Sequence, residues 1–254
     1  MALGEITDDA LMAGRVRLWQ PRAGYRAATD PVLLAAAVPA VRGESALELG
    51  VGAGAASLCL AVRVPGLALT GLEIQPGYAA LARANARRAA VPLEVVECDV
   101  TAMPPALRAQ RFDQVILNPP WHADGPPSAT VARDRAHRTG AEALATWIAA
   151  AVARTRPRGR ITLIHRAERL DAILTALSGP AGEIRILPLA ARAGRAAGRV
   201  IVTARTQVKA PLALLAPLVL HDGAAHFRDE SDFSPRAKAI LSDGAALDLL
   251  ERAV

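Results

Sequence analysis

Short apolar runs alternate with amphipathic segments through most of this chain. Apolar runs bounded by turn residues are typical of buried strands, and segments with apolar positions three and four apart are typical of helices. The pattern predicts strands at 45–49, 67–74, 93–98, 112–117, 160–165, 183–190 and 199–206. It predicts helices at 32–38, 55–64, 78–90, 141–155 and 167–177.

The order of these elements predicts an α/β fold. Repeated strand–helix units indicate a mostly parallel sheet with helices on both faces. The last two strands are joined by a short loop rich in arginine and glycine, which predicts an antiparallel C-terminal hairpin. We therefore expect a mostly parallel seven-stranded sheet that ends in this hairpin.

The length of 254 residues fits one domain. We expect an N-terminal segment and helix (1–42), a core (43–206) and a C-terminal extension (207–254) that the pattern does not shape. Asp30 suits the N-cap of the first helix and Pro31 its first helical position.

Composition adds little about function. The net charge is +6, but lysine occurs only at Lys209 and Lys238, so the excess of arginine indicates a compositional bias as much as a nucleic-acid partner. No apolar run approaches the roughly 20 residues of a membrane span, and the acidic N-terminus lacks the layout of a signal peptide. Cys59 and Cys98 lie in apolar contexts, so we expect core thiols, no metal site and a cytoplasmic location.

The strand predicted at 112–117 ends in the tetrapeptide Asn118-Pro119-Pro120-Trp121. Proline lacks a backbone donor and restricts the residue before it to extended conformations, so Asn118 is held at the strand's end. Ligands bind outside the carboxyl ends of strands in open α/β sheets. A rigid turn that carries an amide acceptor and then a large flat ring suits a planar group bearing an NH2. A proline-rich loop without a function is the alternative.

A glycine-rich loop follows the first predicted strand, from Glu48 through Gly50 and Gly52 to Gly54. Glycine permits a tight turn and a close approach of a ligand to the backbone. Glu73 ends the second strand, at the position of an acid that binds both hydroxyls of a ribose. Asp99 ends the third strand, where it is placed to reach an adenine amino group. The loop and the acids predict a nucleotide site.

The glycine loop also fits a dinucleotide pattern, G-x-G-x-x-A, through Gly50, Gly52 and Ala55. An NAD-dependent oxidoreductase is therefore an alternative, although it leaves residues 118–121 without a task. Glu48 favours another cofactor, because an acid before the loop pairs with a cationic amino group and repels a pyrophosphate.

In this order and spacing, these segments resemble class I S-adenosylmethionine-dependent methyltransferases, in which an Asn-Pro-Pro-aromatic signature marks enzymes that methylate amino or amide nitrogens. The segments Thr-Asp-Pro-Val-Leu-Leu (29–34) and Leu-Ile-His-Arg (163–166) extend the resemblance to bacterial adenine-N6 methyltransferases of a valine tRNA, over about residues 15–206. The resemblance implies a Rossmann-like fold, S-adenosylmethionine as cofactor and an RNA substrate, with tRNA favoured. It implies catalytic roles for Asn118, Pro119, Pro120 and Trp121, and cofactor binding by Thr29, Asp30, Glu48, Gly50, Gly52, Gly54, Glu73, Ile74, Asp99, Val100 and Asn118.

The acceptor remains open at this point. Trp121 stands where tyrosine or phenylalanine is usual, and an Asn-Pro-Pro-aromatic-His run, completed here by His122, is a feature of guanine-N2 enzymes. Similar tetrapeptides also occur in guanine-N2 rRNA enzymes, DNA adenine enzymes and release-factor glutamine enzymes. Guanine-N2 methylation of rRNA and N-methylation of a protein glutamine are therefore alternatives to adenine-N6 methylation. A binding protein without turnover is another, but the glycine loop and the signature are both intact. The sequence does not identify the RNA or the oligomeric state.

Arginines outside the signature are candidates for contacts with RNA phosphates. The simpler interpretation of each is a charged side chain on the solvated surface. His122 is interpreted as a loop residue and His165 as a strand-end residue. The candidates are Arg15, Arg17, Arg22, Arg26, Arg133, Arg135, His137, Arg138, Arg192, Arg195 and Arg199.

Overall fold

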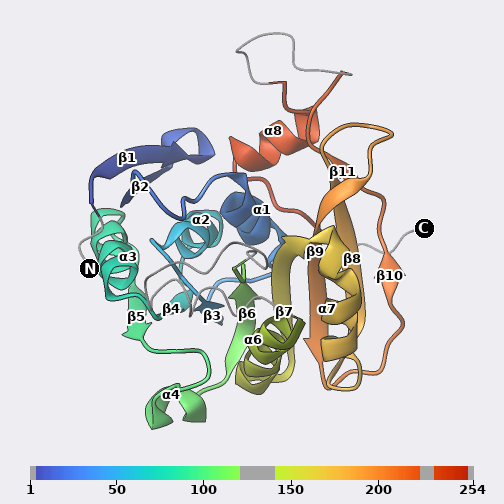
Figure 1. Ribbon diagram of the computed structural model, residues 1–254, viewed down its shortest axis with the longest axis horizontal. Coiled ribbons are helices and arrows are strands. Elements are labelled where there is room, and N and C mark those ends of the chain that lie inside the picture. Colours follow the sequence, from blue (N-terminus) through green and yellow to red (C-terminus); the bar gives the residue numbers. More distant parts are fainter. Residues whose placement is uncertain (1–3, 121–140, 224–231, 251–254) are drawn as a thin grey trace.

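A mixed β-sheet forms the centre of the molecule (Figure 1). The computed structural model describes residues 4–120, 141–223 and 232–250. Within these residues the seven long strands that the sequence predicts are present, in the order β8-β9-β7-β6-β3-β4-β5. Their bounds are β3 Ser45–Leu49, β4 Ala68–Glu73, β5 Leu93–Glu97, β6 Phe112–Leu117, β7 Thr155–Arg166, β8 Ala181–Ala190 and β9 Ala197–Thr206.

The direction of the strands also agrees with the prediction. Strands β3 to β7 are parallel to one another, whereas β9 is antiparallel to both β7 and β8. Strand β7 begins five residues before its predicted start, because Thr155 already pairs with Phe112. In addition, the two-residue strands β10 (Ala213–Leu214) and β11 (Leu218–Val219) pair with β8 in parallel.

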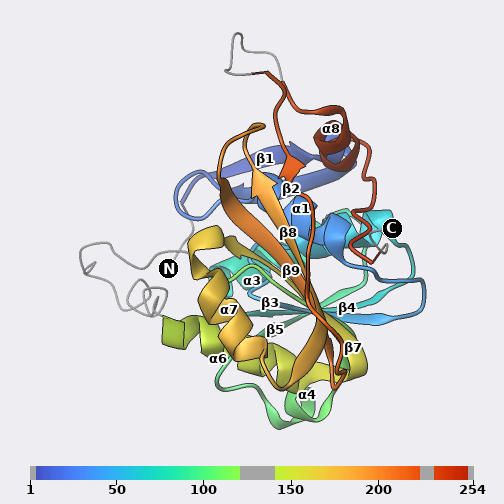
Figure 2. The ribbon, with the colours of Figure 1, turned by 90° about the vertical axis from the view of Figure 1, so that its right-hand side faces the viewer.

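Helices cover both faces of the sheet, as Figure 2 shows. On one face lie α1 (Thr29–Ala37), α2 (Ala55–Arg63), α3 (Pro76–Arg88) and α8 (Pro235–Leu241). On the other lie α4 (Pro105–Ala109), α6 (Ala141–Arg154), the 3-10 turn η2 (Ala167–Arg169) and α7 (Leu170–Leu177). Each face has its own hydrophobic core, so the sheet is buried on both sides.

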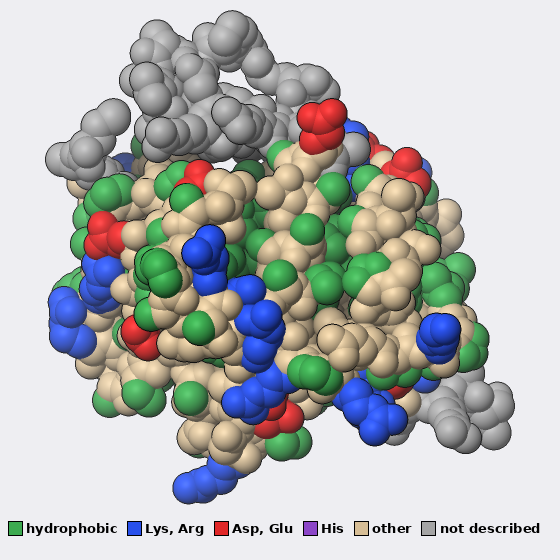
Figure 3. Space-filling view, turned by 90° about the horizontal axis from the view of Figure 1, so that it is seen from below, with side chains coloured by type: hydrophobic (Ala, Val, Ile, Leu, Met, Phe, Trp, Pro, Cys, Tyr) green, Lys and Arg blue, Asp and Glu red, His purple; other side chains and the backbone are tan. Residues whose placement is uncertain are grey.

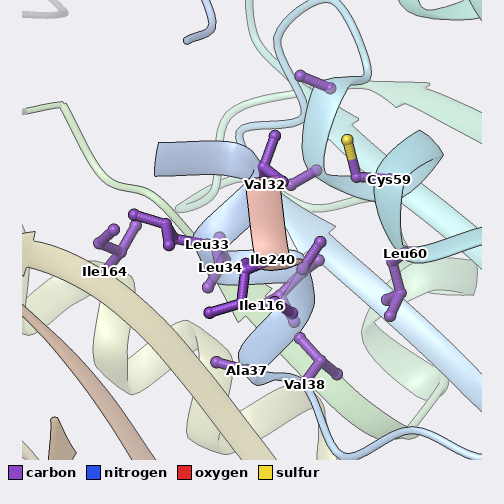
Figure 4. Close-up of a cluster of buried hydrophobic side chains, with 14 of the residues drawn as sticks. Val32, Leu33, Leu34, Ala37, Val38, Cys59, Leu60, Ile116, Ile164 and Ile240 are labelled. Atoms are coloured by element: carbon purple, nitrogen blue, oxygen red, sulfur yellow. The ribbon is translucent and has the colours of Figure 1, made fainter. Parts of the chain in front are cut away.

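Helix α1 is the centre of the first core. Seven of its residues, from Pro31 to Ala37, are buried, and they pack against Leu60 and Cys59 of α2 and Ile116 of β6 (Figure 4). A helix that is apolar all round is stable only when it is enclosed. The C-terminal extension encloses it: Ile240 of α8 joins the same core, and the Leu247 amide donates to the Ala36 carbonyl.

The N-terminal segment forms a hairpin that the hydrophobic pattern did not predict. Strands β1 (Ile6–Leu11) and β2 (Val16–Pro21) pair antiparallel across the 3-10 turn η1 (Met12–Gly14). Asn85 of α3 fixes the hairpin to the core, because its fully buried amide accepts from the Trp19 backbone amide at 2.8 Å and donates to the Trp19 carbonyl at 2.9 Å. The hairpin therefore has a defined place beside α3, and it determines where residues 22–28 begin.

The expected N-cap role of Asp30 is wrong. Helix α1 starts at Thr29, its N-cap position is Ala28, and no side chain caps it. Asp30 lies inside the first turn and forms an ion pair with Arg199 at the start of β9. The sequence could not show this contact, since it joins residues 169 positions apart.

No helix within the described ranges has both the length and the apolar character of a membrane span. Among the same residues, no group of three or more His, Cys, Asp or Glu side chains is arranged to hold a metal ion. Cys59 is buried in the first core as expected, and Cys98 is half-buried against the second.

Candidate active site

The chemistry-bearing residues predicted from the sequence meet at the carboxyl edge of the sheet. In the strand register, Leu49 of β3 lies between Leu72 of β4 and Leu117 of β6. Glu73 and Asn118 each follow these partners by one position, so both lie level with the start of the glycine loop. The topology therefore brings Glu73 and Asn118 to one edge of the sheet. Tyr25, Glu48, Gly50, Tyr78 and Asn118 line a small hollow at this edge.

Glu48 is a buried acid that lines the hollow. It is 5% exposed, and its Oε2 accepts from the Ser57 amide at 2.9 Å and from the Ser57 hydroxyl. Burial disfavours the charged form, which raises the pKa of Glu48 to about 8. A buried acid of this kind suits a cationic partner, because the cation restores the interactions that the carboxylate loses on leaving water.

Glu73 links the glycine loop to strand β4. Its Oε2 accepts from the Gly52 amide at 2.9 Å, and its Oε1 accepts from the Gln75 amide at 2.8 Å. Burial raises the pKa of Glu73. Glu73 thus holds the loop's shape, a role that the sequence did not indicate, while it stays at the edge where the predicted ribose contact requires it.

The glycine loop has a backbone conformation that residues other than glycine rarely adopt. Gly50, Gly52 and Gly54 have φ angles of 71°, 54° and 95°, in the left-handed region that favours glycine. Gly50 also lies against Trp147 of α6, whose ring carbon Cη2 is 2.7 Å from the place of a Cβ at this position. Sequence reasoning missed Trp147 because its neighbours predict only a helix, and only the tertiary fold brings its ring to the loop.

Asp99 and its neighbours form the outer part of the expected cofactor site. Asp99 Oδ1 accepts from the backbone amide and from the hydroxyl of Thr101, both at 2.8 Å, which shapes the turn after β5. Ile74 is 39% exposed at the end of β4, and Val100 is half-buried against the second core. The nearby apolar side chains and the acid are compatible with an adenine ring and its amino group.

Asn118 directly follows strand β6, as predicted, and its Nδ2 donates to the Tyr25 hydroxyl at 3.4 Å. Pro119 is buried and Pro120 is exposed. The remaining signature residue, Trp121, lies outside the described residues, as does His122. Tyr25 was not among the predicted site residues, because it comes from the irregular segment before α1, 93 positions away from Asn118.

Arg199 and His165, which the sequence also singled out, are not among the residues that line the hollow. Arg199 forms the ion pair with Asp30 and reaches the Thr29 hydroxyl at 3.5 Å. This network joins the start of α1 to strand β9. His165 of β7 is buried, which lowers its pKa, as expected for a strand-end histidine.

The arginines proposed for RNA are mostly engaged within the protein. Figure 3 shows one face on which lysine and arginine side chains lie singly or in a short row among apolar and acidic surface. Six of the seven described candidates contact acidic side chains or carbonyls: Arg15 with the Asp243 carbonyl, Arg17 with Asp8, Arg22 with Glu5, Arg26 with Asp9, Arg192 with Asp232 and Arg199 with Asp30. Arg133, Arg135, His137 and Arg138 lie outside the described residues.

A mostly parallel sheet with an acid–glycine loop after β3 and Asn-Pro-Pro after β6 defines a class I S-adenosylmethionine-dependent methyltransferase. The sequence comparison agrees, since residues 28–170 match the family described as Methyltransferase small domain. The chain belongs to this family. It is an enzyme that uses S-adenosylmethionine as its cofactor and methyl donor.

Individual relatives carry more specific names. A tRNA1(Val) (adenine(37)-N6)-methyltransferase of Shewanella pealeana is 30% identical over 91% of this chain and 87% of its own length. An enzyme of the same name from Shewanella halifaxensis is 31% identical over 62% of this chain, and the match spans 64% of that relative.

Solved structures support the fold. A predicted O-methyltransferase from Agrobacterium tumefaciens has a TM-score of 0.69 and 30% identity, covering 89% of this chain and all of that one. A T. thermophilus 16S rRNA N2 methyltransferase, solved with S-adenosylmethionine and guanosine, has a TM-score of 0.55 and 20% identity over 80% of this chain and 50% of that one.

Proposed function

We propose that this methyltransferase transfers a methyl group to the exocyclic N6 amine of an adenine in RNA, and that the RNA is a tRNA. The observation that carries the proposal is the position of Asn118. Its side-chain amide follows β6 directly and lines the same hollow as Glu48 and Gly50. An amide acceptor beside the cofactor loop suits an acceptor group that carries hydrogens, and the names of the relatives point to adenine in tRNA.

The residues present fit the cofactor. Glu48 is a buried acid for its cationic α-amino group, Glu73 and Asp99 are acids for the ribose and adenine, and the left-handed glycines give the loop the tight turn that a close approach to its backbone requires. Bound S-adenosylmethionine supplies a methyl group on a positively charged sulfur. In this assignment Thr29 and Asp30 support the methionine end through the start of α1.

The protein's own contribution is to prepare the acceptor amine. The lone pair of a purine amine is delocalised into the ring, which makes the nitrogen a poor nucleophile. If Asn118 Oδ1 and the Pro119 carbonyl accept its two hydrogens, the nitrogen moves towards tetrahedral geometry and the lone pair becomes available. Positioning of this kind is the main source of rate in such a displacement. Trp121 is assigned to stacking on the base, which stabilises by about 1–3 kcal/mol.

Guanine-N2 methylation is the second candidate, because His122 completes the run typical of guanine-N2 enzymes. Charge does not decide between the substrates, since most described candidate arginines are already paired. Mass spectrometry of nucleosides from the tRNA and rRNA of a strain lacking the gene distinguishes them. We expect loss of N6-methyladenosine from tRNA; loss of N2-methylguanosine from rRNA selects the second candidate.

A further inference from the structure

Tyr25 contacts both halves of the site. Its ring carbon Cε1 lies 3.7 Å from the place of a Cβ on Gly52, in the cofactor loop. Its hydroxyl accepts from Asn118 Nδ2, on the acceptor side. Although Tyr25 belongs to an irregular segment and is 55% exposed, its side chain lines the hollow together with Glu48 and Asn118. One side chain therefore spans the junction at which methyl donor and acceptor must meet.

The backbone around Tyr25 is fixed on both sides. The Tyr78 hydroxyl donates to the Tyr25 carbonyl at 2.9 Å. The buried side chain of Gln20 accepts from the Ala27 amide at 2.8 Å and donates to the Ala27 carbonyl at 3.3 Å. Arg26 donates to the Pro21 carbonyl at 3.0 Å. An irregular segment with its polar backbone groups bonded in this way has few alternative conformations, so the fold determines where the Tyr25 side chain leaves the backbone.

The Tyr25 hydroxyl is a constant hydrogen-bond partner. Although the residue as a whole is exposed, its hydroxyl bonds Asn118 at the hollow, and the partial loss of water there together with the charge of Glu48 raises the pKa of Tyr25 to about 12, so the hydroxyl stays neutral throughout the physiological range. Its bond to Asn118 turns the Nδ2 end of that amide towards the N-terminal segment. The Oδ1 end then points in a different direction, since the two atoms of a planar amide diverge from one carbon.

We propose that Tyr25 is a positioning residue that orients the Asn118 amide so that Oδ1 faces the acceptor amine. The inference rests on the proposed function, in which Asn118 accepts a hydrogen from that amine. Tyr25 makes no bond to the reacting atoms in this account. It acts through Asn118, and the segment from Gln20 to Ala27 supplies the rigid support.

Tyr25→Phe tests the proposal, because it removes the hydroxyl and keeps the ring beside Gly52. The net contribution of one hydrogen bond corresponds to about a 2- to 12-fold change in rate. We expect kcat for tRNA methylation to fall within that range, with the Kd of S-adenosylhomocysteine unchanged within about twofold. In an Asn118→Ala background, Tyr25→Phe should have no further effect, because its target is gone.

Tyr78→Phe is the matched control, since it also removes one tyrosine hydroxyl but one that bonds the Tyr25 carbonyl instead of Asn118. Its effect on rate should depend less on the presence of Asn118 than the effect of Tyr25→Phe does, because it reaches Asn118 only through the backbone of Tyr25. A spectroscopic readout needs no acceptor: the side-chain amide signals of Asn118 in a 1H–15N spectrum, assigned by their loss in Asn118→Ala, should move in Tyr25→Phe and move less in Tyr78→Phe.

Any of the following results for Tyr25→Phe overturns the inference: unmoved Asn118 amide signals, a kcat equal to that of the parent enzyme, or the same loss of rate in the presence and absence of Asn118. A weaker affinity for S-adenosylhomocysteine in Tyr25→Phe also overturns it, by making Tyr25 a cofactor contact. Failure of the proposed function has a different signature, since Asn118→Ala itself then retains activity.

Discussion

The variant Glu48→Gln distinguishes the effect of Glu48 on the stability of the fold from its effect on cofactor binding. Folded Glu48 holds its proton up to about pH 8, whereas an unfolded glutamate loses it near its ordinary pKa of 4.5. The folded state therefore binds more protons, and stability falls as pH rises towards 8. Integrated from pH 6 to pH 9, this loss amounts to about 3 kcal/mol. Glutamine keeps an oxygen for Ser57 but cannot ionise, so the variant escapes the loss.

Thermal unfolding of both proteins at pH 6 and pH 9 measures this effect. A difference of about 3 kcal/mol corresponds to ~6–12 °C in Tm for a chain of this size, with Glu48→Gln the more stable at the higher pH. Ser57→Ala is a control that removes the hydroxyl partner and leaves the ionisable group. Equal pH dependence of the parent protein and Glu48→Gln would refute the raised pKa.

Glu48→Gln should weaken the binding of S-adenosylhomocysteine, although it stabilises the fold at high pH. A cationic α-amino group requires the ionised carboxylate, so binding of S-adenosylhomocysteine at pH 7 should release close to one proton from the parent protein. Calorimetry in buffers of different ionisation enthalpy measures that proton. Glu48→Gln should release none and bind more weakly. If binding releases no proton in the parent protein, Glu48 is not the partner of the amino group.

Three further predictions concern the remaining parts of the site. Asn118→Ala should lower the methylation rate by ~10²–10³ and leave the Kd of S-adenosylhomocysteine nearly unchanged, as single-turnover assays and calorimetry can establish; near-normal activity would show that Asn118 only ends the strand. Asp99→Asn keeps an oxygen for the Thr101 bonds but places a donor opposite the adenine amine, so calorimetry should show that S-adenosylhomocysteine binds about 10- to 100-fold more weakly. Unchanged affinity would show that Asp99 only shapes the turn after β5. Arg195 is in none of the ion pairs between described residues, so Arg195→Ala should reduce the slope of log affinity for tRNA against log salt concentration by about one phosphate contact. Arg17 is paired with Asp8, so Arg17→Ala should leave this slope unchanged.

The hydrophobic pattern was sufficient for the sheet because each core strand is short, buried and ended by turn residues. Strands β3 and β6 begin and end where the pattern predicts. The N-terminal hairpin escaped prediction because β1 is half-exposed and its stability comes from pairing with β2 and from the Asn85 contacts. Helix α8 and strands β10 and β11 are likewise short elements that depend on tertiary packing, which a local pattern does not contain.

The residues of the site also fall into those that the sequence predicts and those that it does not. Residues at strand ends, such as Glu73 and Asn118, were predictable, since the topology alone brings them to one edge. Tyr25 and Trp147 were not, because each reaches the site from an element distant in sequence. The N-cap assigned to Asp30 was locally reasonable, and the ion pair with Arg199 replaced it. Long-range polar contacts therefore limit what can be inferred about a site from the sequence alone.

The most direct test of the central claim uses the purified enzyme, labelled S-adenosylmethionine and total tRNA from a strain that lacks the gene. After digestion to nucleosides, we predict label in N6-methyladenosine with the parent enzyme and a loss of that label with Asn118→Ala. Label in N2-methylguanosine, or in protein alone, would contradict the proposed acceptor.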